Sequence, residues 1–233
     1  MTKILAIDTS GEACSVALDI DGRVLETFEI IPRLHARSLL PMVHSILAEA
    51  EVSVGSLDAI AFGRGPGSFT GLRICAGVVQ GLAFAADVPT LPTSSLAALA
   101  QGVFRRTGHQ HILTVLDARM AELYWAGFQV VDGCAVLLGD EQLSAPAQLD
   151  LTTNLLNAEK SWVGVGDGWK FADQFPAHVM PAVTVLQEDS HVQARDIITL
   201  AQVDFLAGKQ LPAEQALPVY LRGKTAWRKM GDK

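Results

Sequence analysis

The sequence of 233 residues lacks the features that mark disulfide-rich or polyanion-binding proteins. Its three cysteines are odd in number, far apart and without CxxC spacing, which argues against both a disulfide framework and a zinc knuckle. Basic residues number 18 against 25 acidic ones, and the formal net charge of -7 repels phosphate backbones. Any contact with nucleic acid is therefore expected to be local or indirect, and a reducing cytoplasm fits the composition best.

Long apolar runs are also missing. The run Ile4 to Ile7 is ended by Asp8 long before it reaches the length of a secretion signal. The longest uncharged stretch, Ile74 to Ala86, is shorter than the roughly 20 residues that cross a bilayer, and glycines interrupt it. We expect no membrane association and predict that this stretch is a core or interface helix.

No familiar catalytic or metal-binding motif is complete. The loop from Gly63 to Arg73 lacks the Lys-Ser/Thr pair of a Walker motif, and Thr70 replaces the third glycine of GxGxxG. Ser68 lacks the flanking glycines of GxSxG. The six histidines form neither HExxH nor a pair four residues apart on a helix. We predict no catalytic residue, no metal and no cofactor.

The patterns that are present predict an α/β protein with two similar lobes. Short β-rich runs lie on both sides of Asp21-Gly22, a strong tight-turn signal. Helical periodicity follows at residues 36–51. A second strand ending in aspartate, Ile112 to Asp117, repeats the plan of the first. We predict a duplicated, ribonuclease-H-like fold of the actin and heat-shock ATPase kind. Its lobes are placed at 1–105 and 106–233, with the alternative that the C-terminal helix and tail pack back on the first.

The glycine-rich loop and two aspartates are the candidate chemical groups. The loop follows a strand and opens a helix, so its free amides could hold an anion, or its glycines could serve only close packing. Asp8 and Asp117 end the first strand of each lobe, where carboxylates of such folds bind magnesium or activate water, but either could be only a strand-end cap. The members of this structural loop or vestigial nucleotide site are Asp8, Gly65, Gly67, Ser68, Thr70 and Gly71.

The C-terminal segment is basic. Trp227 lies among five cations and one acid, which are Arg222, Lys224, Arg228, Lys229, Lys233 and Asp232. Such a segment could grip RNA or an acidic partner, or could be a solvated terminus.

Three motifs together resemble the bacterial TsaB (YeaZ) family over essentially the whole chain. They are KILAIDTS at 3–10, GPGSFTGLR at 65–73 and PVYLR at 218–222. The resemblance implies an actin-like ATPase fold and a noncatalytic partner of TsaD, the enzyme that puts threonylcarbamoyl on the adenosine beside the tRNA anticodon. It also implies that the ATPase TsaE joins the assembly, that tRNA is contacted through the complex, and that the chain forms a homodimer when alone. Metal-binding members carry two histidines four apart on the first helix, where this chain has only His35.

Members of this family pair through their first two helices, which fall here at about 35–50 and 70–86. Both helices have more apolar or small surface than one core stripe requires, which marks an interface, although all of it could equally be internal core. The predicted partner or dimer interface is Leu39, Met42, Val43, Ile46, Leu47, Arg73, Ala76, Gly77, Val79 and Gly81.

The alternative function is an ATP-dependent enzyme with a nucleotide between the lobes, held by Asp8, Asp117 and the glycine loop.

Overall fold

The computed structural model describes residues 2–151, 162–186 and 191–222 and divides the chain into two compact units. The first unit comprises Met1–Ala98 and His191–Pro218, and the second comprises Leu99–Ser190 and Val219–Lys233. The division falls inside α3 (Ser95–Thr107), where the sequence placed the boundary at 105/106, and it groups residues 191–218 with the first unit.

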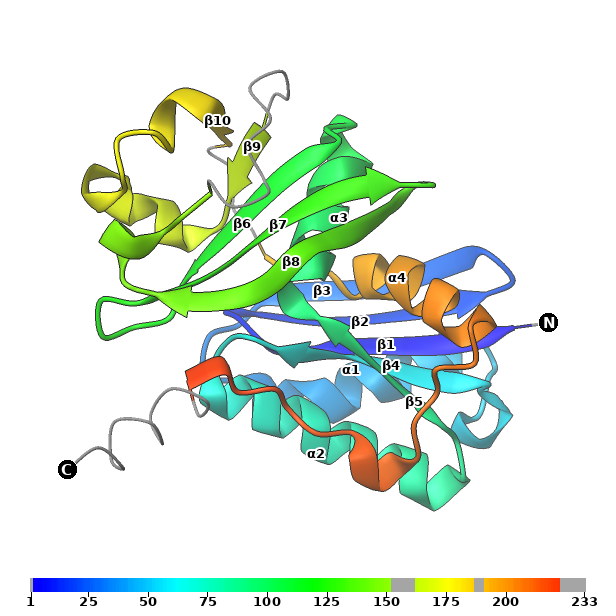
Figure 1. The fold of residues 1–233 in the computed structure, drawn as a ribbon. Helices are drawn as coiled ribbons and strands as arrows, with labels where there is room; N and C mark the ends of the chain where they lie inside the picture. The colour runs from blue at the N-terminus through cyan, green and yellow to red at the C-terminus, as the bar shows by residue number, and fades with distance from the viewer. Residues whose placement is uncertain (1, 152–161, 187–190, 223–233) are drawn as a thin grey trace. The chain divides into compact units, whose positions relative to one another are not determined.

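The sheet of the first unit has the strand order β3-β2-β1-β4-β5 (Figure 1). Its first three strands form an antiparallel meander, and the last two run parallel to β1. The strands are β1 (Lys3–Asp8), β2 (Ala13–Ile20), β3 (Arg23–Ile30), β4 (Ala59–Gly65) and β5 (Thr90–Ser94). Asp21 and Gly22 both have positive φ, 50° and 88°, which matches the twist that a two-residue hairpin needs.

Helices cover both faces of this sheet (Figure 1). α1 (His35–Glu49) and α2 (Phe69–Ala86) pack on one face, and α4 (Ala194–Leu206) lies on the other, against β1, β2, β4 and β5. Because both faces are covered, β1 and β2 are almost entirely buried, and most of their residues are apolar. The short helices η1 (Val54–Ser56) and η5 (Ala213–Gln215) complete this unit.

The second unit repeats the topology. Its sheet has the order β10-β9-β6-β7-β8, again a meander followed by two parallel strands. Asp132 and Gly133, with φ of 50° and 80°, form its hairpin as Asp21 and Gly22 do in the first. The strands are β6 (His111–Asp117), β7 (Leu123–Val131), β8 (Cys134–Ser144), β9 (Trp162–Val165) and β10 (Val183–Val185). The short helices are η2 (Pro146–Gln148), η3 (Asp167–Gln174) and η4 (Met180–Ala182). The duplicated α/β fold predicted from the sequence is confirmed.

Candidate functional site

Asp8 ends β1 in a fully enclosed position at the carboxyl edge of the parallel strands. Its Oδ1 accepts hydrogen bonds from Ser10 N and Ser10 Oγ, both at 2.9 Å. Its Oδ2 is buried without a hydrogen-bond partner and points at the backbone of Gly63, where an added Cβ would lie 1.9 Å away. Burial raises the pKa of Asp8 to about 7, although the two bonds from Ser10 act to lower it. The neutral form of this carboxyl is therefore favoured far more than in a solvent-exposed aspartate.

The glycine-rich loop packs on the turn that follows Asp8. A Cβ on Gly71 would lie 1.9 Å from Thr9 O, and one on Gly67 would lie 2.5 Å from Ser10 O. Thr9 Oγ1 donates to Gly71 O at 2.8 Å. The loop thus holds the β1–β2 turn against the first turn of α2, and only glycine allows such an approach.

Two amides of this loop, those of Ser68 and Gly71, are engaged within the chain. Ser68 N donates to Ser10 O at 2.7 Å, and Gly71 N donates to Ser68 Oγ at 3.3 Å, which makes Ser68 the N-cap of α2. Gly65 has φ of 103°, and Thr70 is exposed on the first turn of the helix. The structure therefore brings Asp8, Gly67, Ser68 and Gly71 together, with Ser10 as the residue that joins them. These contacts account for the glycines by packing.

Asp117 ends β6, the equivalent strand of the second unit, in a different environment. Its Oδ2 accepts from Lys170 Nζ at 2.7 Å and from Arg119 Nη1 at 3.2 Å, and its Oδ1 accepts from Arg119 N at 2.7 Å. Partial burial acts to raise its pKa, but the bonds and charges of Lys170 and Arg119 outweigh it and lower the pKa. At neutral pH Asp117 is an ionised carboxylate with its partners in place.

The predicted interface residues divide into a buried and an exposed set. Those on α1 and two of those on α2 are core side chains, each 7 % exposed or less: Leu39, Met42, Val43, Ile46, Leu47, Ala76 and Val79. The three-and-four spacing that singled them out is the stripe facing the sheet. In the isolated chain they are not available to a partner, so charged substitutions at Val43 or Val79 would test folding rather than docking.

Arg73, Gly77 and Gly81 lie on the outer face of α2, where an added Cβ on either glycine would meet nothing within 4 Å. Phe84, 81 % exposed, lies on the same face, and Arg73 lies over the ring of Phe69 at 3.9 Å. We define the outer face of α2 by these five residues. By length and composition alone α2 could cross a membrane, and 33 % of its 18 residues are buried inside the protein. An apolar helix with so much exposed surface is typical of a docking site.

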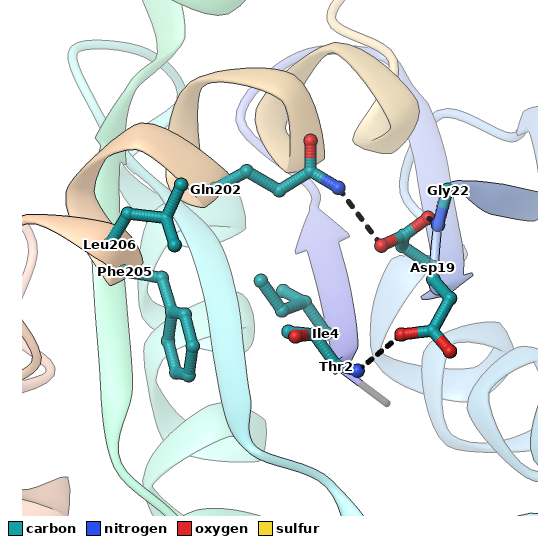
Figure 2. Close-up of a pocket in the computed structure, with 8 residues that line it drawn as sticks. Thr2, Ile4, Asp19, Gly22, Gln202, Phe205 and Leu206 are labelled. Atoms are coloured by element: carbon teal, nitrogen blue, oxygen red, sulfur yellow. Dashed lines mark hydrogen bonds between the residues drawn. The ribbon is translucent and has the colours of Figure 1, made fainter.

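A separate pocket of about 230 Å³ opens where β1 begins, beside the β2–β3 turn and the end of α4 (Figure 2). Asp19 on its wall accepts from Gly22 N and Gln202 Nε2, both at 2.9 Å, and Asp21 accepts from Thr2 N at 2.6 Å. Its remaining lining is largely apolar and includes Leu206. These polar groups bind each other and fix the pocket wall, and the pocket offers no recognisable catalytic set.

Comparison with known proteins decides the family. The family model described as "TsaD: tRNA N6-adenosine threonylcarbamoyltransferase" matches residues 29–228. A relative from Escherichia coli K12, named tRNA threonylcarbamoyladenosine biosynthesis protein TsaB, is 40% identical over 99% of this chain and 99% of its own. The chain belongs to the TsaB family. The Haemophilus influenzae protein of the same name is 37% identical over 97% of this chain and 96% of its own. The structure of YeaZ from Pseudomonas aeruginosa is 46% identical, with a TM-score of 0.89, and covers 95% of this chain and 100% of its own.

The histidine noted on the first helix is a packing residue in this TsaB-family chain. His35 is buried, with Nε2 3.2 Å from Ala13 O, and Leu39 one turn later lies in the core. In the part of the chain that the structure describes, no three His, Cys, Asp or Glu side chains are grouped as metal ligands.

Sequence reasoning missed three residues that the structure makes important. Ser10 bonds Oδ1 of Asp8, Gly63 leaves room for its Oδ2, and Phe84 is the more exposed of the two phenylalanines on the outer face of α2. Phe84 could have been found, since it lies off the apolar stripe that includes Val79 and Ala83. Of the basic C-terminal segment only Arg222 lies within the described residues, and the rest of that prediction lies outside them.

Proposed function

We propose that this chain is a noncatalytic partner that activates a TsaD-like enzyme in the threonylcarbamoylation of tRNA adenosine. Its relatives are named for threonylcarbamoyladenosine biosynthesis, and the matching family model is described as a threonylcarbamoyltransferase. The observation that carries the proposal is the outer face of α2, which is apolar, flat at its two glycines and exposed.

The environments of the two strand-end aspartates, Asp8 and Asp117, support a noncatalytic role for the chain. Asp8 is enclosed by Ser10 and Gly63, and a substrate atom that reached Oδ2 would need the space of the Gly63 backbone. Asp117 is neutralised by Lys170 and Arg119. A general base or a magnesium ligand needs an accessible carboxylate, and neither residue offers one.

The docking surface in this proposal combines α2 with the neighbouring exposed side of α1. The two helices contact each other and share one face of the sheet (Figure 1). Leu40, half exposed on α1, and Phe84 on α2 supply large apolar side chains. Gly77 and Gly81 let another helix approach closely, and Arg73 supplies a cation at the edge, as interfaces commonly combine an apolar centre with a polar rim.

Reconstitution of tRNA modification tests the proposal. The partner enzymes, tRNA, threonine, bicarbonate and ATP are combined with and without this chain, and modified adenosine is measured by mass spectrometry. We expect product only when the chain is present, and Phe84→Glu should raise the half-maximal activating concentration at least tenfold, because it places a charge in the apolar centre. Leu206→Glu is the matched control, since Leu206 is 86 % exposed on α4 and its variant should activate normally. Equal activation by both variants would sink the placement of the interface.

The same face accounts for the expected homodimer when the partner is absent, because two copies can cover each other's apolar surface. Sedimentation equilibrium should show a dimer for the isolated chain and for Leu206→Glu, and a weaker dimer for Phe84→Glu. In this proposal the complex forms in the cytoplasm and also contains a TsaE-like ATPase. It binds tRNA mainly through the other subunits.

Nucleotide turnover by the chain alone is the competing outcome. Calorimetry with magnesium and ATP, followed by a phosphate-release assay, should show no turnover that depends on Asp8 or Asp117. Turnover lost in Asp8→Asn or Asp117→Asn would overturn the noncatalytic role and leave the interface to be judged separately.

A further inference from the structure

The pocket where β1 begins combines a buried carboxylate with apolar walls (Figure 2). Ile4 of β1 and Phe205 of α4 supply apolar surface, and Gln202 reaches from α4 to Asp19 of β2. The volume of about 230 Å³ is below the range of roughly 300 to 1,000 Å³ found for drug-sized ligands, so the pocket suits a group the size of one side chain. It lies on the face of the sheet opposite α2, and it is therefore independent of the proposed docking surface.

Asp19 contributes a negative charge whose hydrogen-bond donors are neutral. The residue is 1 % exposed, and its two oxygens accept from Gly22 N and Gln202 Nε2, both at 2.9 Å. A backbone amide and a side-chain amide satisfy the oxygens without neutralising the charge. A carboxylate has about four lone-pair sites, so two accepted bonds leave capacity for another donor. A buried charge of this kind is stabilised by a cation close by.

The described residues that line the pocket include no lysine, arginine or histidine. Asp19 pairs with Ile4 on one side and with Val24 on the other, so these three side chains lie on one face of the sheet. The adjacent Lys3 and Arg23 point to the opposite face, because side chains alternate along a strand. The cations nearest in sequence therefore do not neutralise the pocket.

The end of α4 adds to the negative potential. The last turn of this helix, all of it within the described residues, contains no basic side chain, so the partial negative charge of the helix C-terminus is not offset there. Lys209, which follows the helix, donates to Asp204 Oδ1 at 2.7 Å and is not a lining residue. Asp21 at the mouth is a second acid and accepts from Thr2 N at 2.6 Å.

We infer that this pocket binds one primary alkylammonium group, with its carbon chain against Ile4 and Phe205 and its ammonium beside Asp19. An ammonium is a compact charge with three donors, whereas a guanidinium binds best to a carboxylate with both oxygens free. Both Asp19 oxygens are already bonded, which favours the ammonium. A free alkylamine and the lysine side chain of a peptide share this chemistry.

Titration of the full-length chain with pentylamine, followed by amide chemical shifts, tests the inference at neutral pH, where the amine is an ammonium. We expect a dissociation constant of about 1 mM for this small ligand and binding at least about tenfold weaker for pentan-1-ol, a neutral control of the same chain length. Asp19→Asn should weaken pentylamine binding at least about tenfold and leave the alcohol unchanged. A capped tripeptide with a central lysine is the second arm: tighter binding than pentylamine assigns the site to a lysine side chain, and weaker binding assigns it to a free amine.

Gln202→Leu is the matched control, because it removes the hydrogen bond to Asp19 and keeps the carboxylate. It should bind pentylamine at least as tightly as the wild type does. Loss of binding in both variants would show that the shape of the wall matters and the charge does not, which overturns the inference, as does equal binding of the amine and the alcohol. If Asp19→Asn does not fold, added salt gives the answer with the wild type: it should weaken binding of the amine but not of the alcohol, and an amine affinity independent of salt contradicts the inference.

Discussion

The β1–β2 turn and the β6–β7 loop occupy the same place in two copies of one topology, yet they have become opposites. Each follows a strand that ends in aspartate. In the first unit Thr9 and Ser10 of the turn are buried under the glycine loop, and no cation among the described residues bonds to Asp8. In the second unit the loop is exposed, and Asp117 holds two cations. A duplicated strand end is thus buried by internal packing in one unit and exposed in the other.

The pKa values express this difference. Burial without a countercharge raises the pKa of Asp8 to about 7, whereas two neighbouring cations lower that of Asp117 despite its partial burial. A carboxylate without a compensating charge is costly in a dry interior, so the first unit keeps its aspartate close to the neutral form. The two units should therefore respond in opposite directions to pH and to neutralising substitutions.

Filling the space between the glycine loop and the β1–β2 turn should cause the largest change in the free energy of unfolding. Gly71→Ala places a methyl group 1.9 Å from Thr9 O, a backbone atom that cannot move without disturbing Asp8, and should cost about 3 kcal/mol or more. Circular dichroism in a urea titration measures the loss. Gly77→Ala is the control on the same helix: its Cβ meets nothing, so helix propensity should stabilise the chain by up to about 1 kcal/mol. Equal effects at the two positions would show that the loop does not clasp the turn.

Tryptophan fluorescence adds a check on which unit is damaged. Trp125, Trp162 and Trp169 are buried in the second unit, and the fourth tryptophan, Trp227, belongs to the C-terminal segment of the chain outside the described residues. If the units unfold independently, Gly71→Ala shifts the transition seen by circular dichroism and leaves the fluorescence transition in place.

Neutralising Asp8 should cause the next largest change in the free energy of unfolding, and this change should stabilise the folded chain. The folded chain binds this proton more tightly than the unfolded chain, so the contribution of Asp8 to stability is full below about pH 4 and is lost as pH rises to about 7. Asp8→Asn keeps an oxygen for Ser10 without the charge, and should raise the free energy of unfolding at pH 8, where the wild-type carboxyl is ionised, by roughly 1 to 4 kcal/mol. Urea midpoints at pH 4 and pH 8 measure it. A variant less stable than wild type at pH 8 would mean that the carboxylate has a countercharge or ligand.

Some of this contrast was readable from the sequence, and some was not. Asp21-Gly22 predicted its hairpin because a preference for positive φ at both positions is a local property of the sequence. Asp132-Gly133 has the same pattern and also forms a hairpin, but it was not used in the prediction. The helical spacing of Leu39 and Val43 correctly marked one stripe. Periodicity cannot say whether a stripe meets the protein's own sheet or a partner, and here it meets the sheet. Asp8 and Asp117 look alike in sequence because their chemistry is set by residues distant in the chain, through burial against Gly63 at Asp8 and through the Lys170 ion pair at Asp117.

Neutralising Asp117 should cause the smallest change in the free energy of unfolding, and unlike the change at Asp8 it should destabilise the fold. Its folded pKa lies below the unfolded value, so its contribution is present above about pH 4 and is lost as pH falls further. Asp117→Asn should destabilise the second unit by less than about 1 kcal/mol at pH 7, because Lys170 and Arg119 are exposed and solvent screens the pairs. Tryptophan fluorescence in urea reports it, and the difference from wild type should vanish in acid. A double-mutant cycle with Lys170→Met isolates the pair: strict additivity would mean that Lys170 does not stabilise Asp117, and the contrast with Asp8 would then rest on solvent exposure alone.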